Sequence, residues 1–312
     1  MGRLRTVTLG VIAILLVAAC GPGAATSGPS VLPTQAASQA AAVTPEPTPD
    51  ACDAANIDTL NAGQLTVGTD EPAYPPFYFI DDPAPDGSTW SLGQPPNGKG
   101  LESATAYAIA QKLGFSTDQV VWVVSPFDLA IQPGDKNFDM HLGQISYSPE
   151  RAEVVDLSDG YFDLNQAVVA LASNDIVKVT TVAELKAFKL GAAVGTTSYQ
   201  YIVDQIKPDK EPRVYNDNTA AIAGLEGDQI DGIVADLPTT FYMRDAQLDD
   251  GQIVGSLPTA AGAEVEHFSV LLDKGSALTP CVNVALAAMK EDGTLAAIVD
   301  EWIAGGGAPE LK

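Results

Sequence analysis

Histidine is scarce in this chain, and several catalytic signatures are missing altogether. The 312 residues contain two histidines, His141 and His267, which lie far apart and lack the neighbours that would bind a metal or activate a nucleophile. No GxSxG, HExxH, CxxC or GxxxxGK[ST] motif occurs. This removes the usual sequence support for a serine hydrolase, a zinc protease, a dithiol redox protein or a P-loop protein. We therefore expect no catalytic residue, no metal and no cofactor.

Basic residues are also few, since 16 Lys and Arg stand against 40 Asp and Glu and give a formal net charge of -24. A protein this acidic is repelled by phosphate backbones, which argues against nucleic acid as a partner. The composition, 46% hydrophobic and 18% charged, is that of a globular protein with a substantial core. The length suits two domains or two lobes of one unit.

Long apolar runs are absent after the first twenty residues. The segment MGRLRTVTLGVIAILLVAAC has a charged start, an apolar run too short for a permanent anchor, and small residues at its end, which is the layout of a secretory leader. Its last residues, LVAAC, resemble a bacterial lipobox. Residues 1–20 are therefore predicted to be a lipoprotein signal peptide with Cys20 as the lipidation site. An ordinary signal peptide with an incidental cysteine is the alternative.

Residues 21–50 are rich in Ala, Pro, Thr, Ser and Gly and carry almost no charge. Such a segment buries too little surface to offset the entropy of ordering it, so we expect a disordered tether. Beyond the tether only two cysteines remain, Cys52 and Cys281. In an oxidising compartment such a pair indicates one disulfide, and two buried free thiols are the alternative.

Apolar strands alternate with amphipathic helices along the rest of the chain, which predicts an α/β fold with parallel-rich sheets. Gly114 is a typical stop signal for the first helix. The expected strands cover 65–70, 120–124, 138–146, 166–173, 189–198, 230–236 and 268–273, and the expected helices cover 101–115, 198–206, 219–227, 237–247, 278–293 and 294–305.

Residues 81–99, DDPAPDGSTWSLGQPPNGK, contain more turn-forming residues than a helix or a strand tolerates. They predict a long loop between the first strand and the first helix. A loop of this length in a compact body is often functional, or else disordered. Trp90 within it either covers a cleft or packs on the surface.

Six segments occur in the order of the successive signatures of one protein family. They are GTDEPAYPPFYF, GLESATAYAIAQKLGF, FDMHLGQISYSPERAEVVDLSDGYF, GAAVGTTSYQYI, IDGIVADLPTTFYM and CVNVALAAMKEDGTLAAIVDEW. They resemble the extracellular solute-binding proteins of polar amino-acid ABC importers, family 3, and the resemblance covers nearly all of residues 57–304. A Cys52–Cys281 bond also resembles the one seen in Gram-positive lipoprotein members.

The resemblance implies a two-lobed, periplasmic-binding-protein-like (type II) fold with a hinge of two crossing segments. Lobe 1 would comprise residues 51–163 and 267–312, and lobe 2 residues 164–266, with crossings near 161–166 and 264–267. It also implies a protein that captures an amino acid between its lobes and delivers it to the permease of an ABC transporter. We expect a monomer, held by its lipid on the outer face of the bacterial cell membrane.

Two other classes remain open on the same fold. One is a cyclohexadienyl-dehydratase-like enzyme that would use an acid in the same cleft, although no extra acid–base pair stands out. The other is a ligand-sensing lipoprotein, although no membrane-spanning segment follows the domain to carry a signal directly.

The ligand carboxylate needs a counter-group, because burying a charge unpaired is costly. Arg151 presents parallel N–H donors that match both carboxylate oxygens. Ser146 matches a family position whose hydroxyl and amide join this clamp, and Gly143 and Gln144 match positions where the backbone approaches the ligand. Arg151 could instead be a solvated cation in a turn.

Four further positions are assigned from the same resemblance. Thr197 matches the family's carboxylate contact and, with Thr196, opens a helix whose free amides suit an anion, or the pair is a plain helix cap. Asp236 ends a strand and matches the acidic anchor for the ammonium, or it caps the next helix. Asp70 resembles the residue that faces the ligand's side chain or ammonium, or it caps a turn.

Tyr74 and Phe127 match two aromatic stacking positions that would hold the ligand's side chain. We expect a polar or cationic amino acid, because Asp70, Glu71 and Asp128 are predicted near the side-chain end. Glutamine, glutamate and small neutral residues remain open. Gln144 departs from the small residue usual in the family, so its amide either enters the pocket or narrows it.

Overall fold

The computed structural model describes residues 49–80, 87–303 and 307–312. The predicted signal peptide with Cys20, nearly all of the predicted tether, and the start of the 81–99 loop lie outside the described residues. Within the described part of the chain, no helix is both long and apolar enough to cross a membrane. In the same residues no group of three or more potential metal ligands gathers.

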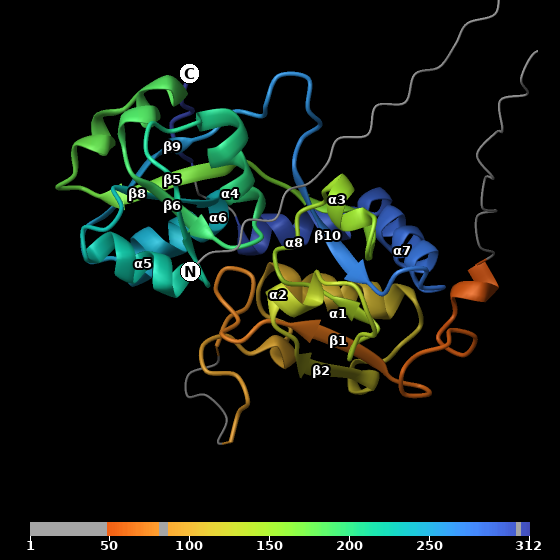
Figure 1. The fold of residues 1–312 in the computed structure, drawn as a ribbon. Coiled ribbons are helices and arrows are strands. Elements are labelled where there is room, and N and C mark those ends of the chain that lie inside the picture. Colours follow the sequence, from red (N-terminus) through yellow and green to blue (C-terminus); the bar gives the residue numbers. More distant parts are fainter. Residues whose placement is uncertain (1–48, 81–86, 304–306) are drawn as a thin grey trace, which may run out of the picture. The chain divides into compact units, whose positions relative to one another are not determined.

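The first sheet has the strand order β2-β1-β3-β10-β4, and its strands β1, β2 and β10 are labelled in Figure 1. β1 pairs in parallel with β2 and β3, whereas β10 runs antiparallel to β3 and β4. Every residue of β1 is buried, as expected for a strand covered on both faces. The strands are β1 (Leu65–Thr69), β2 (Val120–Val124), β3 (Met140–His141), β4 (Asp156–Asp163) and β10 (His267–Leu272).

The second sheet repeats this plan with the order β7-β6-β8-β5-β9. β6 pairs in parallel with β7 and β8, and β5 is antiparallel to β8 and β9. Figure 1 shows β5, β6, β8 and β9 together with the helices α4 to α6. The strands are β5 (Gln166–Leu171), β6 (Leu190–Ala193), β7 (Arg213–Tyr215), β8 (Gly232–Asp236) and β9 (Gly251–Ser256).

The helices cover the sheets and close separate apolar cores. The largest core joins β1 and β10 to α1, α7 and α8, and two further cores lie on the second sheet. The helices are α1 (Leu101–Lys112), α2 (Phe127–Ala130), α3 (Pro149–Ala152), α4 (Thr197–Tyr201), α5 (Asn218–Glu226), α6 (Leu237–Tyr242), α7 (Thr279–Glu291) and α8 (Thr294–Trp302). The 3-10 helices are η1 (Pro49–Cys52), η2 (Pro95–Asn97), η3 (Thr117–Gln119), η4 (Asp175–Lys178) and η5 (Val182–Ala187), and the π-helices are η6 (Ile202–Ile206) and η7 (Met243–Gln247).

The strand expected at 138–146 is wrong in length, because only Met140 and His141 pair with β1. Gln144 has φ of 52°, a left-handed conformation that a strand cannot contain. The chain therefore turns at this point instead of continuing along the sheet. The antiparallel strands β4 and β9 and the three-residue strand β7 were not expected, because polar residues and glycines interrupt their apolar patterns.

Between β4 and β10, two connections in the described part of the chain join a strand of one sheet to a strand of the other. The first connection passes from β4 to β5 through Leu164 and Asn165, and the second connection, residues 257–266, passes from β9 to β10. The Leu164 N–H donates to the Glu266 carbonyl at 2.9 Å, so the two connections run side by side. Paired connections of this kind allow two lobes to rotate with few backbone changes.

The C-terminal residues 307–312 pair with the second sheet, whereas the sequence placed them in lobe 1. Leu311 is 1% exposed and packs into a core of that sheet. The Ser256 N–H donates to the Pro309 carbonyl at 2.8 Å, and the Leu311 N–H donates back to Ser256 at 2.9 Å. Trp302 and Ile303, only a few residues earlier, pack on the first core. Leu311 is a single apolar residue outside any strand or helix pattern. The sequence therefore gave no indication that residues 307–312 pack against the second sheet.

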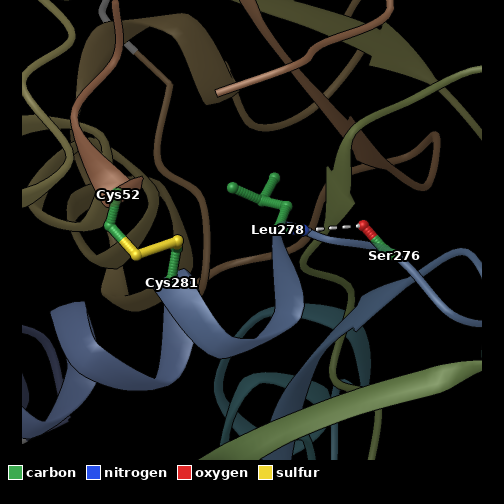
Figure 2. The surroundings of a disulfide bond; sticks show 4 residues. All are labelled: Cys52, Ser276, Leu278 and Cys281. Atoms are coloured by element: carbon green, nitrogen blue, oxygen red, sulfur yellow. Dashed lines mark hydrogen bonds between the residues drawn. A yellow bond between two sulfur atoms is a disulfide. The ribbon is translucent and has the colours of Figure 1, made fainter. Parts of the chain in front are cut away.

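The predicted disulfide is confirmed. Cys52 and Cys281 are bonded, with their Cα atoms 5.2 Å apart, and both residues are buried in the first core. Figure 2 shows the bond joining the end of η1 to the start of α7, where the Leu278 N–H donates to the Ser276 hydroxyl. The pair closes a sequence separation of 229 residues.

Trp90 neither covers a cleft nor packs on the surface. It is 7% exposed and belongs to the first core, because its indole is apolar enough to be buried with Leu and Phe side chains. The neighbouring Ser91 donates from its backbone N–H and its hydroxyl to the Glu71 carboxylate. The described part of the 81–99 loop is thus fixed to the first sheet.

Candidate ligand-binding site

A pocket of about 160 Å³, called the ligand pocket below, is lined by residues from elements of both sheets. The carboxyl ends of β1, β6 and β8 lead directly into it, as is usual for open α/β sheets. The structure brings every sequence-predicted binding residue to its wall. These are Asp70, Tyr74, Phe127, Gly143, Gln144, Ser146, Arg151, Thr196, Thr197 and Asp236.

Arg151 is not a solvated cation, since it is only 9% exposed. It lies in α3, a single turn that begins at Pro149 and is capped by the Ser148 hydroxyl. Its Nη1 donates to the Ser146 carbonyl at 2.5 Å, and its Nη2 donates to the Gly195 carbonyl at 2.7 Å. Gly195 follows β6, so this second hydrogen bond joins the two sheets. The guanidinium also lies 5.4 Å from the centre of the Phe127 ring.

Asp236 ends β8 and caps α6, because its Oδ1 accepts the Thr239 N–H at 3.0 Å. Capping occupies one carboxylate oxygen and restrains the side chain, which lines the pocket. Burial raises the pKa of Asp236 to about 6, against an ordinary value of 3.8, and the Thr239 hydrogen bonds act in the opposite direction. A cation beside this carboxylate would favour its charged form.

Asp70 follows β1 directly and holds the opposite wall in place. Its Oδ1 accepts the Glu71 N–H at 2.8 Å, and its Oδ2 accepts the Phe127 N–H at 3.3 Å. Burial raises the pKa of Asp70, and the nearby carboxylates of Asp128 and Asp217 act in the same direction. A cation bound beside Asp70 would therefore offset the repulsion between these carboxylates.

Tyr74 bridges the two sheets at the rim of the pocket. Its hydroxyl lies 2.8 Å from the Thr219 hydroxyl on α5, and its ring centre lies 6.1 Å from that of Tyr242 at the end of α6. Phe127, the first residue of α2, is half-buried beneath the Arg151 guanidinium. Both rings line the pocket from segments that follow strands of the first sheet, Tyr74 after β1 and Phe127 after β2.

Thr196 is the N-cap of α4, and Thr197 is the first residue of this helix. The Thr196 hydroxyl accepts the Tyr199 N–H at 3.2 Å and donates to the Ala193 carbonyl at 2.8 Å, so Thr196 is a helix cap. The Thr197 hydroxyl faces the first sheet, 3.4 Å from the Ser146 hydroxyl. Of the two, Thr197 has the geometry for a ligand contact.

Gln144 lines the pocket, but its amide is held from below by Glu102. The Gln144 N–H donates to Glu102 Oε1 at 2.6 Å, and its side-chain amide donates to Oε2. Tyr161 donates to the same carboxylate at 2.5 Å. Glu102 is fully buried, and burial raises its pKa to about 7, with the Tyr161 and Gln144 hydrogen bonds acting in the opposite direction. This network fixes the left-handed turn that places Gly143 to Ser146 along the pocket.

Position 143, in the same turn, has no room for a side chain. A Cβ at this position would lie 2.6 Å from the imidazole of His141, whose Nε2 is bonded to the Ser125 carbonyl. His141 is fully buried, and burial lowers its pKa to about 4. It packs beneath the pocket and does not line it.

Glu71 does not lie at the side-chain end of the pocket, contrary to the sequence-based expectation. Its carboxylate accepts from Ser91 and anchors the loop, whereas Pro72, Ala73 and Tyr74, which follow it, line the pocket. Asp128 does line the pocket and is exposed.

Sequence reasoning missed several pocket residues, among them Asp217, Gln166 and Tyr78. Asp217 caps α5 by accepting the Ala220 N–H at 2.7 Å, and an aspartate before an apolar helix could have been recognised as a cap. Its place in the pocket depends on β7, a strand too short to be predicted. Four aspartates and one arginine now line the pocket, namely Asp70, Asp128, Asp217, Asp236 and Arg151.

Comparison with known proteins agrees with this geometry. Residues 65–305 match the family model described as bacterial extracellular solute-binding proteins, family 3. The L-cystine-binding protein TcyJ of Escherichia coli (strain K12) is 30% identical over 251 residues, which cover 77% of this chain and 82% of that protein. The arginine-binding periplasmic protein of Mannheimia haemolytica is 27% identical over 242 residues, 75% of this chain and 90% of that protein.

The fold is likewise that of solved amino-acid-binding proteins. The structure titled as an ancestral arginine-binding protein bound to arginine superposes with a TM-score of 0.60 and 29% sequence identity, covering 78% of this chain and 99% of that one. The predicted periplasmic-binding-protein-like fold is thereby confirmed. The match of the family model to most of the chain shows that this protein belongs to the bacterial extracellular solute-binding proteins of family 3.

Proposed function

We propose that the protein captures a cationic amino acid in the ligand pocket outside the membrane and presents it to the permease of an ABC importer. The observation that carries this proposal is that Arg151 and Asp236 line one pocket, although Arg151 lies in α3, between strands of the first sheet in sequence, and Asp236 ends β8 of the second sheet. A zwitterion needs a counter-charge for each end, and these two side chains provide one of each sign.

The ligand carboxylate would bind Arg151, with Ser146 and Thr197 beside it. The guanidinium is held by two carbonyls and by the Phe127 ring, so its remaining N–H groups are already oriented before the ligand arrives. Such pre-organisation reduces the entropy lost on binding. The ammonium would bind Asp236, whose carboxylate is oriented by the cap on α6.

The preference for a cationic side chain comes from the charges that are left over. Once Arg151 and Asp236 are paired with the ligand, three aspartates still line the pocket: Asp70, Asp128 and Asp217. A neutral side chain would leave this negative field uncompensated, whereas a guanidinium or an ammonium would neutralise part of it. The Tyr74 and Phe127 rings can stack on the same cation.

Capture would work through a shift between open and closed arrangements of the two lobes. A ligand that contacts Arg151 on one side and Asp236 on the other binds the closed arrangement more tightly and so increases its population. The paired connections at Leu164 and Glu266 are the natural hinge. Lipidation at Cys20 would keep a monomer close to its permease.

Calorimetry of residues 51–312 with the twenty amino acids tests the proposal. We expect arginine or lysine to bind with a Kd in the micromolar range or below, about -8 kcal/mol, and glutamate not to bind. Tighter binding of a neutral or acidic amino acid would contradict the cationic preference. Turnover of prephenate or arogenate by the same protein would contradict the transport function itself.

The pH dependence of binding provides a test of Asp236. Its pKa is about 6 in the ligand-free protein, and the ammonium favours the charged carboxylate. Below pH 6 a proton must be released when the ligand binds, so the Kd should rise by up to about tenfold for each unit that the pH falls. Above pH 7 the Kd should be constant.

The pH measurement uses calorimetry in two buffers of different ionisation enthalpy, which counts the protons released. The control is Asp236→Asn, which should bind weakly at all pH values and lose this proton release. A wild-type Kd that is unchanged from pH 5 to pH 8 would exclude Asp236 as the ammonium partner.

A further inference from the structure

Glu266 lies on the second connection, between the ligand pocket and a larger cavity. That cavity, of about 470 Å³, is lined by both connections and by Glu266. Gln166 and Thr197 line this cavity and the ligand pocket alike. The Glu266 carboxylate therefore reaches the wall of the ligand pocket from behind, at a position that the sequence-based assignment did not include.

The Glu266 carboxylate takes hydrogen bonds from two pocket residues. The Thr197 hydroxyl donates to Oε1 at 2.6 Å, and the Gln166 amide lies 3.1 Å and 2.9 Å from the two oxygens. Gln166 in turn accepts the Ser198 hydroxyl at 2.6 Å. A hydroxyl has a single proton to donate. The proton of Thr197 is therefore already used by a carboxylate of the protein.

The charge of Glu266 also acts on Arg151. Burial lowers the pKa of Arg151 below its ordinary value of 12.5, and the carboxylates of Glu266 and Glu150 act in the opposite direction. The Thr197 hydroxyl, which donates to Glu266, lies 3.4 Å from the Ser146 hydroxyl. The backbone carbonyl of Ser146 accepts a hydrogen bond from Arg151. Glu266 is thus coupled to both groups that the proposed function assigns to the ligand carboxylate.

We propose that Glu266 is a resident substitute for the ligand carboxylate, which holds the Thr197 hydroxyl in the ligand-free protein and must give it up when an amino acid binds. The inference rests on the proposed function, because it requires the ligand carboxylate to lie at Arg151 and Thr197. Two carboxylates cannot share the one Thr197 proton, and like charges at close range repel. Glu266 therefore weakens binding and keeps the hydroxyl satisfied while the pocket is empty.

Glu266→Gln separates this role from a purely structural one. Glutamine keeps an acceptor oxygen for Thr197 but removes the negative charge, so the Kd for L-arginine should fall by about tenfold. If Glu266 merely held Thr197 in place for the ligand, the same change would leave the Kd unchanged or raise it. Calorimetry at pH 7.5 and low salt gives the sign directly.

The matched control is Glu264→Gln, two residues earlier on the same connection. Glu264 is exposed, lines the same cavity and has the same charge, so its variant should bind L-arginine within about twofold of wild type. The second control is L-argininamide, which has a neutral carboxamide in place of the carboxylate. Glu266→Gln should not tighten its binding.

Three outcomes decide the matter. The inference is supported if Glu266→Gln has a lower Kd for L-arginine than wild type, has no lower Kd for L-argininamide, and Glu264→Gln shows no such decrease. An equal or higher Kd in Glu266→Gln overturns it while leaving the proposed function intact, provided that wild type binds. Absence of binding to wild type overturns both. Should Glu266→Gln fail to fold, Glu266→Ala removes the same charge from a half-buried position and should also lower the Kd.

Discussion

Arg151→Met should weaken the binding of L-arginine by about a thousandfold. Truncating one partner of a buried, hydrogen-bonded charge pair costs about 4 kcal/mol, and 1.4 kcal/mol corresponds to a factor of ten. Methionine retains most of the apolar stem over the Phe127 ring, and removing a buried charge relieves its desolvation. We therefore expect the variant to fold and to lose binding, as measured by calorimetry together with a thermal unfolding curve.

Two further variants sharpen this result. Arg213→Met makes the same change at an exposed residue of β7, and it should leave the Kd unchanged. Arg151→Lys keeps the charge but loses the two parallel N–H donors, so its Kd for L-arginine should lie between those of wild type and Arg151→Met. Binding by Arg151→Met within tenfold of wild type would show that the ligand carboxylate lies elsewhere.

Removing the disulfide should cost more stability than any other change considered. In the double variant Cys52→Ala, Cys281→Ala, the unfolding free energy should fall by about 5 kcal/mol, because the bond closes a sequence separation of 229 residues. Both cysteines lie in the first core and neither lines the ligand pocket. The Kd for L-arginine should therefore stay within about twofold of wild type.

Urea unfolding of residues 51–312 measures this difference. Wild type in the presence of a reductant should unfold at the same urea concentration as the double variant, and the reductant should not affect the variant. A loss of stability below about 1 kcal/mol would mean that the unfolded chain gains little freedom from the open loop, contrary to the entropy argument.

The positions of the binding residues were predictable where local signals and family signatures coincide. Asp236 ends an apolar strand and precedes Leu-Pro, a sequence that indicates both a strand end and a helix cap, and the structure shows that cap. Arg151 follows Ser-Pro-Glu, which predicts a capped turn with proline in its first position, and α3 is such a turn. Their assignment to a ligand stays a prediction until binding is measured.

Pocket residues that depend on long-range neighbours were not predictable. Asp217 reaches the pocket because β7 adds to the edge of the second sheet, although β7 has only three residues. Glu71 was expected in the pocket because it follows Asp70, yet Ser91 of the loop holds it away. Glu266 has no local signature, since its partners Thr197 and Gln166 lie 69 and 100 residues away in sequence.

The sequence by itself predicted most of the alternating strands and helices from local periodicity and the family from residue types in a fixed order. It also predicted the Cys52–Cys281 bond, because these are the two cysteines left after the leader. Only the tertiary structure decided which carbonyls hold Arg151, where Gln144 turns, and which sheet receives the C-terminal residues. These features depend on contacts between segments distant in sequence, and the energy of such contacts appears only when the chain has folded and excluded water from them.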